Sequence, residues 1–207
     1  SIWTRLTPED RVLDIGTGSG VISLLLASRG VKSILVIDID GPSVNEATTN
    51  FNKSPWNNLL SAKLQRLQDF GLEHKTKFDL IISNPPFFIQ GVLSASERQS
   101  NARHARSLSY SELVVNVCKL LNKSGIFSIV LPYNAANHFI TLCRQNDLFL
   151  RRKMLIFPHR GTTPNRINME FSFQRDVDIK VDMLNIREDN NEYTEEYQLM
   201  TKEYYLW

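Results

Sequence analysis

Cysteine and long apolar runs are scarce in this sequence. Its 207 residues include two cysteines, Cys118 and Cys143, which lie among apolar residues and form no C-x-x-C pair. This usage predicts reduced thiols in the core and argues against a disulfide framework or a metal site. No apolar run approaches the ~20 residues of a membrane-spanning helix, and the sequence shows no signal peptide. We therefore expect a cytoplasmic protein with no membrane partner and no metal.

The chain has enough apolar residues to fill one core. Hydrophobic residues make up 42% of the sequence, which favours one α/β domain over residues 1–207. In the first half, short apolar runs alternate with helical segments, a pattern that predicts parallel βαβ units with ligands at the carboxyl ends of the strands. The expected strands are 12–15, 33–38, 62–67, 78–83, 125–131, 149–157 and 166–175, and two further short elements are expected at 179–186 and 194–204.

The net charge of +2 is unevenly distributed. Residues 98–175 hold 12 basic and 3 acidic side chains, a balance of +9, whereas residues 176–207 hold 3 basic and 9 acidic ones. A basic block of this size is a candidate surface for a polyanion, although its members can also be ordinary solvated side chains on several faces. Residues 151–153 can equally be a charged strand edge that discourages pairing. The arginines placed on loops, where phosphates can reach them, are Arg98, Arg103, Arg106, Arg160 and Arg166.

A glycine-rich turn follows the first expected strand. Its G-x-G-x-G pattern allows a nucleotide to approach the backbone closely. A carboxylate just ahead of the turn would repel a pyrophosphate but favours a cation. S-adenosylmethionine carries a sulfonium and an ammonium and no phosphate, so it fits better than a dinucleotide. The candidate cofactor-binding residues of this turn are Asp14, Gly16, Thr17, Gly18 and Gly20.

Two more carboxylates follow the next two expected strands. Asp38 comes 18 residues after Gly20, where an acid can accept the two ribose hydroxyls of a nucleoside. Asp69 is placed to accept from an adenine amino group, with Ile39 and Phe70 on the two faces of the ring. The alternatives are a helix cap at Asp38 and a turn residue at Asp69, while Asp40 is assigned to the turn that follows.

The fourth expected strand ends in a rigid polar motif, Asn84-Pro85-Pro86-Phe87. Proline fixes its own φ and biases the preceding residue towards an extended conformation, so these residues form a stiff bracket. The Asn84 side-chain carbonyl and the Pro85 backbone carbonyl can each accept one hydrogen of a planar NH2 group. Phe87 can stack on the flat group that carries the nitrogen. The alternative is a proline-rich β-turn without a catalytic role.

Together these features resemble class I S-adenosylmethionine-dependent methyltransferases that act on exocyclic or amide nitrogens. Other features are similar to those of the bacterial family that methylates N6 of an adenine beside the anticodon of valine tRNA. They are Ser-Pro-Trp at 54–56, the Gln90-Gly91 pair, Ala102-Arg103 and the tyrosines of the acidic tail.

The resemblance implies a Rossmann-like α/β fold, with a mostly parallel seven-stranded sheet and an antiparallel C-terminal strand pair. It implies S-adenosylmethionine as methyl donor and tRNA as substrate, and the protein is expected to be a monomer. Members of the family carry a segment before the first strand that helps to hold the methionine end of the cofactor. We expect this sequence to lack that segment, with Trp3 as its last trace.

Other activities use a similar bracket or a similar amine. They are methylation of a glutamine amide in protein, of guanine N2 in ribosomal RNA and of adenine in DNA. The basic block argues against the protein substrate, and the residues do not exclude the other two. An RNA-binding module without activity is disfavoured because Asp14, the glycines, Asp38 and Asn84 are all present. Since an alkylated amine loses its proton readily, no catalytic role is expected for His104, His138 or His159.

Overall fold

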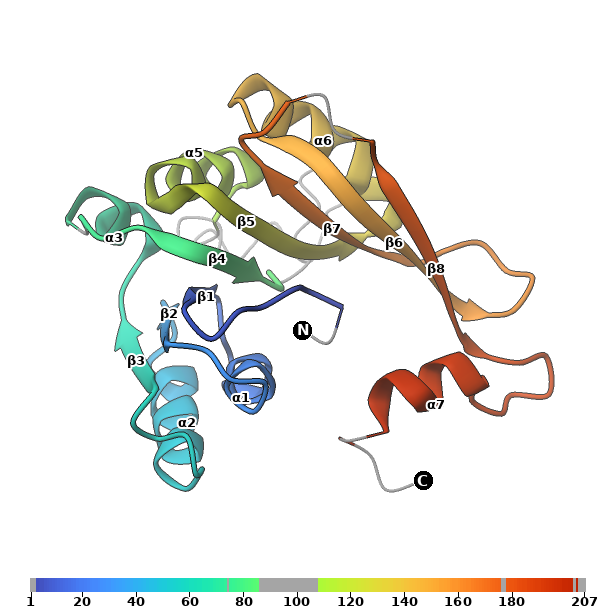
Figure 1. The fold of residues 1–207 in the computed structure, drawn as a ribbon, viewed down its shortest axis with the longest axis horizontal. Coiled ribbons are helices and arrows are strands. Elements are labelled where there is room, and N and C mark those ends of the chain that lie inside the picture. Colours follow the sequence, from blue (N-terminus) through green and yellow to red (C-terminus); the bar gives the residue numbers. More distant parts are fainter. Residues whose placement is uncertain (1–2, 74, 86–107, 176–177, 203, 205–207) are drawn as a thin grey trace, which may run out of the picture.

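Within the residues that the computed structural model describes, eight strands form one sheet in the order β3-β2-β1-β4-β5-β7-β6-β8 (Figure 1). The described residues are 3–73, 75–85, 108–175, 178–202 and 204. The strands are β1 Arg11–Ile15, β2 Ser33–Asp38, β3 Leu60–Leu64, β4 Phe78–Ser83, β5 Leu121–Pro132, β6 Phe149–His159, β7 Arg166–Ser172 and β8 Lys180–Arg187. Only β7 runs antiparallel to its neighbours, β5 and β6. The expected parallel sheet with an antiparallel strand pair is confirmed, but it has eight strands rather than seven.

The additional strand is β8, which pairs in parallel with β6 from Lys180 opposite Arg152 onwards. β6 is therefore an interior strand, and the interpretation of residues 151–153 as a strand edge is wrong. The guanidinium of Arg152 donates to the Asp182 carboxylate at 2.8 Å and to the Trp3 carbonyl at 3.1 Å. A basic residue is tolerated inside the sheet because an acid on the next strand pairs with it.

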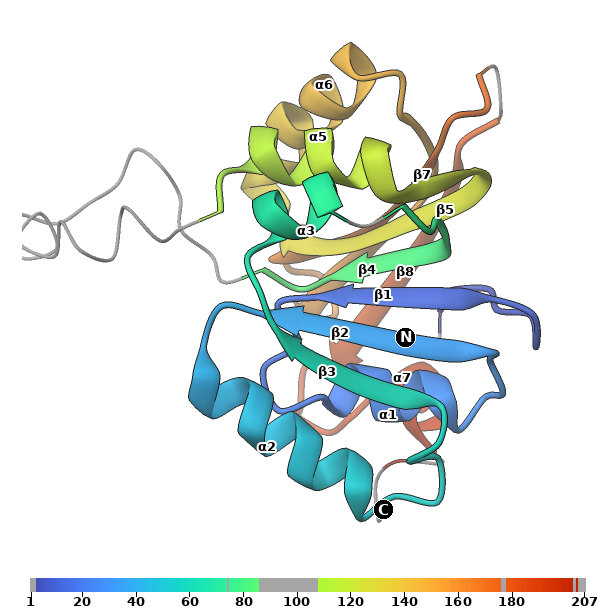
Figure 2. The same ribbon diagram turned by 90° about the vertical axis from the view of Figure 1, so that its left-hand side faces the viewer.

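Helices cover both faces of the sheet (Figure 2). On one face lie α1 Val21–Ala27, α2 Gly41–Asn52 and α7 Glu195–Thr201, and on the other lie α3 Leu67–Glu73, α5 Tyr110–Leu120 and α6 Ala136–Gln145. Successive strand residues point to opposite faces, so Val12 packs with the α1 and α2 side while Leu13 packs with the α5 and α6 side. In the described residues no helix is long and apolar enough to cross a bilayer.

The segment before β1 packs against the far end of the sheet. The buried Trp3 side chain contacts Met154 of β6 and Leu184 of β8 in a small apolar cluster. Its indole N–H donates to Asp182 at 2.7 Å, and the Arg152 guanidinium lies 4.3 Å from the ring centroid. A cation over a tryptophan face contributes about 0.5–2 kcal/mol. These contacts link the segment before β1 to the last strands.

The third strand differs from the expectation in its position. β3 covers Leu60–Leu64, and helix α3 already begins at Leu67, so the expected strand at 62–67 was placed too late. Asp69 therefore lies in the first turn of a helix rather than at a strand end. Leu67 is apolar because it is a buried residue of α3, and the strand itself ends three residues earlier at Leu64.

A glycine in the first loop supplies a stability prediction. Gly20 has a φ of +81°, and a Cβ at that position would lie 2.5 Å from Cε1 of Phe51. Gly20→Ala should lose about 1–2 kcal/mol to left-handed strain and a further 1–3 kcal/mol to overpacking. Gly30→Ala is the matched control, because Gly30 has a φ of +78° and open space around it. Urea unfolding measures both, and equal losses would show that the Phe51 contact does not matter.

Candidate active site

The polar residues singled out above gather at the carboxyl edge of the sheet, where β1 pairs with β2 on one side and β4 on the other. Ile15 is level with Ile37 of β2 and with Ser83 of β4. One residue further, Asp38, Gly16 and Asn84 follow on three adjacent strands. With strands about 4.8 Å apart, Asp38 and Asn84 are separated across β1 by roughly 10 Å. This is also the point at which the strand order reverses, a common position for ligand binding in open α/β sheets.

The glycine turn leaves its backbone open. Gly16 and Gly18 have φ values of +73° and +56°, and a Cβ at either position would meet nothing within 4 Å. The Gly16 N–H donates to the Ile37 carbonyl at 2.9 Å, which ties the start of the turn to β2. A ligand can therefore approach the backbone of the turn directly, as the glycine pattern predicts.

Asp14 is buried beneath this turn rather than exposed to a ligand. Its Oδ2 accepts hydrogen bonds from the Thr17 hydroxyl at 2.8 Å and the Ser23 hydroxyl at 2.7 Å. Burial raises the pKa of Asp14 to about 6, while these two hydroxyls act in the opposite direction. Asp14 and the buried Thr17 thus hold the shape of the turn, and Asp14 places a negative charge behind it when ionised. The sequence did not single out Ser23, whose only signal is its position in the first turn of the helix.

The carboxylate of Asp38 bridges two backbone groups. Its Oδ2 accepts from the Gly18 N–H at 3.1 Å and its Oδ1 from the Asp40 N–H at 3.0 Å. Each oxygen keeps a second lone pair, so the carboxylate can also accept two hydroxyls. Helix α2 is capped by Asp40, which accepts from the Ser43 hydroxyl at 2.7 Å and from the Ser43 N–H at 2.9 Å, and these two hydrogen bonds lower the pKa of Asp40. Asp38 is therefore not the helix cap.

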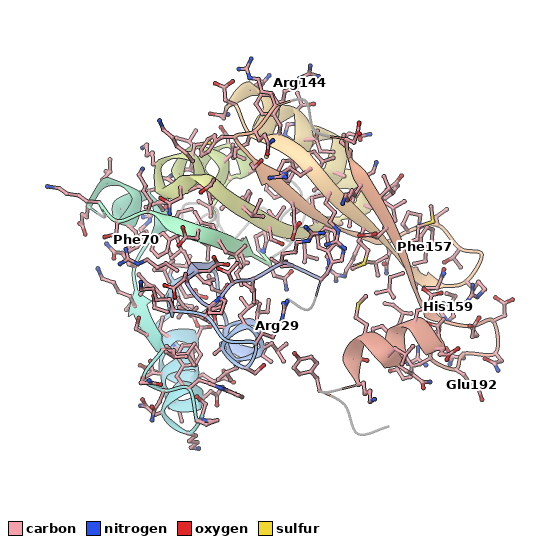
Figure 3. All side chains as sticks on the ribbon, in the orientation of Figure 1. Arg29, Phe70, Arg144, Phe157, His159 and Glu192 are labelled. Atoms are coloured by element: carbon pink, nitrogen blue, oxygen red, sulfur yellow. The ribbon has the colours of Figure 1, made fainter. Side chains whose placement is uncertain are left out.

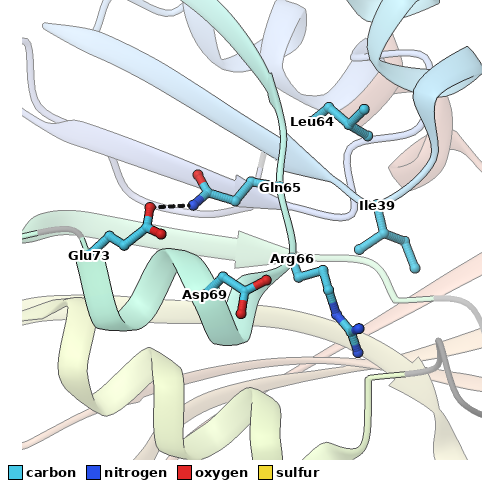
Figure 4. Close-up of a pocket in the computed structure, with 6 residues that line it drawn as sticks. All are labelled: Ile39, Leu64, Gln65, Arg66, Asp69 and Glu73. Atoms are coloured by element: carbon cyan, nitrogen blue, oxygen red, sulfur yellow. Dashed lines mark hydrogen bonds between the residues drawn. The ribbon is translucent and has the colours of Figure 1, made fainter.

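A cavity of about 390 Å³ lies beside the ends of β2 and β3 (Figure 4). It brings together Ile39 and Asp69, as expected for an adenine pocket. The Phe70 side chain is only 1% exposed and packs at 6.3 Å from the Phe78 ring in the core. The expectation that Phe70 stacks on a base is therefore wrong. The exposed Leu64 lines the cavity instead, and sequence reasoning missed it because the strand was placed too late. The other lining residues are Gln65, Arg66 and Glu73.

Asn84 is exposed one residue beyond β4. The Ser83 hydroxyl donates to the Ile15 carbonyl at 2.9 Å, so the end of β4 is fastened to the end of β1. Pro85 follows and is half-buried, whereas Pro86 and Phe87 lie outside the described residues. The structure thus brings the asparagine next to the glycine turn, with Gly16 between it and Asp38.

Only two of the five candidate arginines lie in the described part of the chain, since Arg98, Arg103 and Arg106 do not. Arg160 is ion-paired with Glu188 at 2.7 Å and with Glu196 at 3.6 Å. The acidic tail therefore neutralises part of the basic block at the end of the sheet where Figure 3 labels His159 and Glu192. Arg166 is exposed at the first residue of β7, opposite Pro132 at the end of β5.

Two further findings concern the described residues: the lack of a metal site and the state of the two cysteines. Among them, no group of three or more His, Cys, Asp or Glu is arranged to hold a metal ion. Both cysteines are free thiols, Cys143 buried and Cys118 half-buried. Burial is the main cause that raises the pKa of Cys118 to about 11, so this thiol is protonated at neutral pH.

Comparison with known proteins adds independent evidence. The model of the methyltransferase small domain matches residues 4–136. A tRNA1(Val) (adenine(37)-N6)-methyltransferase of Bacteroides thetaiotaomicron is 34% identical over 206 residues, covering 99% of this chain and 86% of the relative. The enzyme of the same name in Tolumonas auensis is 30% identical over 206 residues, covering 99% and 85%.

Solved structures show the same fold at low sequence identity. A predicted O-methyltransferase of Agrobacterium tumefaciens aligns with a TM-score of 0.70 and 13% identity, over 99% of this chain and 94% of the other. The ribosomal protein L11 methylase of Lactobacillus delbrueckii aligns with a TM-score of 0.56 and 21% identity, over 79% and 69%. The fold is therefore the Rossmann-like methyltransferase fold.

The geometry of Asp38 generates a binding prediction. Asp38→Asn keeps the size of the side chain but removes the charge and one hydroxyl acceptor. Hydrogen bonds to charged groups contribute about 1.5–3 kcal/mol, so S-adenosylhomocysteine should bind roughly 10- to 150-fold more weakly. Calorimetric titration measures the change. Asp40→Asn is the control, since it keeps the α2 cap and should leave the affinity unchanged; an Asp38→Asn variant with wild-type affinity would contradict the assignment.

Proposed function

The chain belongs to the methyltransferase small domain family, and we propose that it transfers the methyl group of S-adenosylmethionine to the exocyclic N6 of adenine 37 in a valine tRNA. The observation that carries this proposal is the common level of Asp38, Gly16 and Asn84 on three adjacent strands. A nucleoside cofactor held at Asp38 and Gly16 lies within reach of an amine held at Asn84. The names of the relatives supply the base and the position.

The described residues fit the proposed cofactor. Gly16 and Gly18 leave space for close approach, and the buried Asp14 favours a cation above the turn. Asp38 is assigned to the ribose hydroxyls, and Ile39, Leu64 and Asp69 to the adenine. This set contains carboxylates and glycines that leave room for close approach but no cluster of basic residues, which suits a ligand without phosphates.

The reaction needs little more than positioning. When bound, S-adenosylmethionine supplies an electrophilic methyl group on its sulfonium. The N6 lone pair of adenine is delocalised into the ring, so the amine is a weak nucleophile. We assign the Asn84 side-chain carbonyl and the Pro85 backbone carbonyl to the two N6 hydrogens. These acceptors direct the lone pair at the methyl group and stabilise the positive charge that develops on nitrogen.

A cofactor held by Gly16, Gly18 and Asp38 would supply its methyl group to N6 and would leave as S-adenosylhomocysteine, and the alkylated nitrogen would release its proton to water. No strong base is required at this step. The target adenine must leave the base stack to reach the edge of the sheet, which is easiest in a single-stranded loop. An anticodon loop meets this condition.

Transfer of labelled methyl groups tests the substrate class. The protein is incubated in turn with unmodified tRNA, ribosomal RNA, DNA and a protein extract, and mass spectrometry maps the product. Label in tRNA at adenine 37 supports the proposal. Label at guanine in ribosomal RNA, at adenine in DNA or at glutamine in protein would each replace it with one of the alternatives considered above.

Removal of the Asn84 amide should separate chemistry from cofactor binding. Loss of one preorganised acceptor typically lowers turnover by 10²–10³-fold, so Asn84→Ala should lose about that much in kcat. Its affinity for S-adenosylhomocysteine should change little, because Asn84 lies on the β4 side of Gly16. Asn137→Ala, at an exposed asparagine of α6, serves as the control. Near-normal turnover of Asn84→Ala would refute the assignment.

The candidate arginines can be tested through the salt dependence of tRNA binding. Each phosphate contact contributes about 0.7–0.9 to the slope of log affinity against log salt concentration. Arg103→Ala and Arg166→Ala should each weaken binding and flatten the slope by about one contact. Arg144→Ala is the control, because Arg144 projects from the outer side of α6 (Figure 3). A slope that stays at the wild-type value would show that the substituted arginine meets no phosphate.

A further inference from the structure

One exposed aromatic side chain stands at the edge of the sheet that carries Asn84. Tyr133 opens the 3₁₀ turn Tyr133–Ala135 directly after β5. Ser83 is level with Ile129 on β5, and Pro132 lies three residues further along that strand. At about 3.3 Å per residue, Tyr133, one residue after Pro132, therefore stands roughly 13 Å beyond the level of Ser83, one strand away from Asn84.

The backbone holds Tyr133 in place on both sides. Its N–H donates to the Asn165 carbonyl at 3.0 Å, and its carbonyl accepts from the Ala136 N–H. The neighbouring side chains of Leu131 and Ala136 are buried in the core. The ring is thus presented from a fixed position rather than from a loose loop.

A single exposed tyrosine needs no explanation by itself. Among the described residues, however, only two aromatic side chains are exposed, Tyr133 at 45% and Tyr193 at 36%. Tyr193 stacks on Tyr197 at 5.3 Å between centroids and has the Arg187 guanidinium 4.0 Å from its ring. Within the part of the chain that the structure describes, no ring or guanidinium covers Tyr133 in this way.

The surroundings of Tyr133 suit a nucleic acid. Arg166 is exposed and lies opposite Pro132 in the β5–β7 ladder, one ladder position before the Asn165 that binds the Tyr133 N–H, so a cation and the tyrosine belong to the same end of the sheet. The turn that supplies the Asn165 carbonyl joins β6 to β7 at the same edge. An aromatic face next to a basic side chain is the combination that binds single-stranded RNA, in which a base stacks and its phosphate is paired.

We infer that Tyr133 is a stacking platform for a nucleotide that flanks the target adenine in the RNA loop. The inference rests on the proposed function. Tyr133 lies too far beyond Asn84 to face the adenine held there, whereas the next nucleotide of an extended loop passes over this part of the edge. The stacked base and the phosphate beside Arg166 fix the direction of the loop, so that the adenine enters the site from the β5 side.

Kinetics with an unmodified valine tRNA transcript test the inference. Loss of a base–aromatic stack weakens binding by roughly 5- to 150-fold, so Tyr133→Ala should raise KM for tRNA within that range. Its affinity for S-adenosylhomocysteine should not change. Tyr133→Phe keeps the ring and should behave like the wild type. Met183→Ala, which removes a 64% exposed side chain from the middle of β8, should have no effect.

Fluorescence locates the stacked base. 2-Aminopurine is placed on the 5′ or the 3′ side of the target adenine in an anticodon stem-loop. The wild type and Tyr133→Phe should quench one of the two positions, and Tyr133→Ala should not. If wild-type protein methylates tRNA but Tyr133→Ala shows unchanged KM and unchanged quenching, the platform is refuted while the function stands. If the wild type methylates no RNA, the function fails and the platform fails with it.

Discussion

The lateral pairing of β1 with β2 and β4 determines where every proposed catalytic group lies. Two hydrogen bonds fasten the three strand ends, from the Gly16 N–H to the Ile37 carbonyl and from the Ser83 hydroxyl to the Ile15 carbonyl. A register shift of one residue would turn the side chains of a strand to the opposite face. The methyltransferase geometry therefore depends on buried apolar strands that make no contact with either substrate.

The buried carboxyl of Asp14 shows that the site costs stability. Its pKa rises from 3.8 to about 6 on burial, so the folded protein holds this proton more tightly than the unfolded chain does. The resulting stabilisation is complete below about pH 4 and is lost as the pH rises through about 6. At neutral pH the fold thus carries an unfavourable ionised group, which the Thr17 and Ser23 hydroxyls partly offset. The charge is retained where a cationic ligand is proposed to bind.

The sequence predicted those parts of the molecule that depend on local pattern. The glycine turn, Asp38 and Asn84 each follow an apolar strand, and parallel topology brings such positions to one edge. The sequence pattern could not predict contacts between residues that are far apart in the chain. The assignment of Phe70 to the adenine failed because the strand and helix at 60–73 lacked a clear boundary. The basic block was overestimated because Arg152 and Arg160 pair with Asp182 and Glu188 of the tail, residues distant in sequence.

The docking of Trp3 onto β6 and β8 has a consequence for how the protein is made. Trp3 leaves the ribosome long before Arg152 and Asp182, the two residues that enclose its indole. Asp182 follows Trp3 by 179 residues, so this hydrogen bond cannot form until the chain has been synthesised as far as β8. Contacts of such high sequence separation form late and slowly. The joint between the segment before β1 and the last strands therefore closes only after β8 has been made.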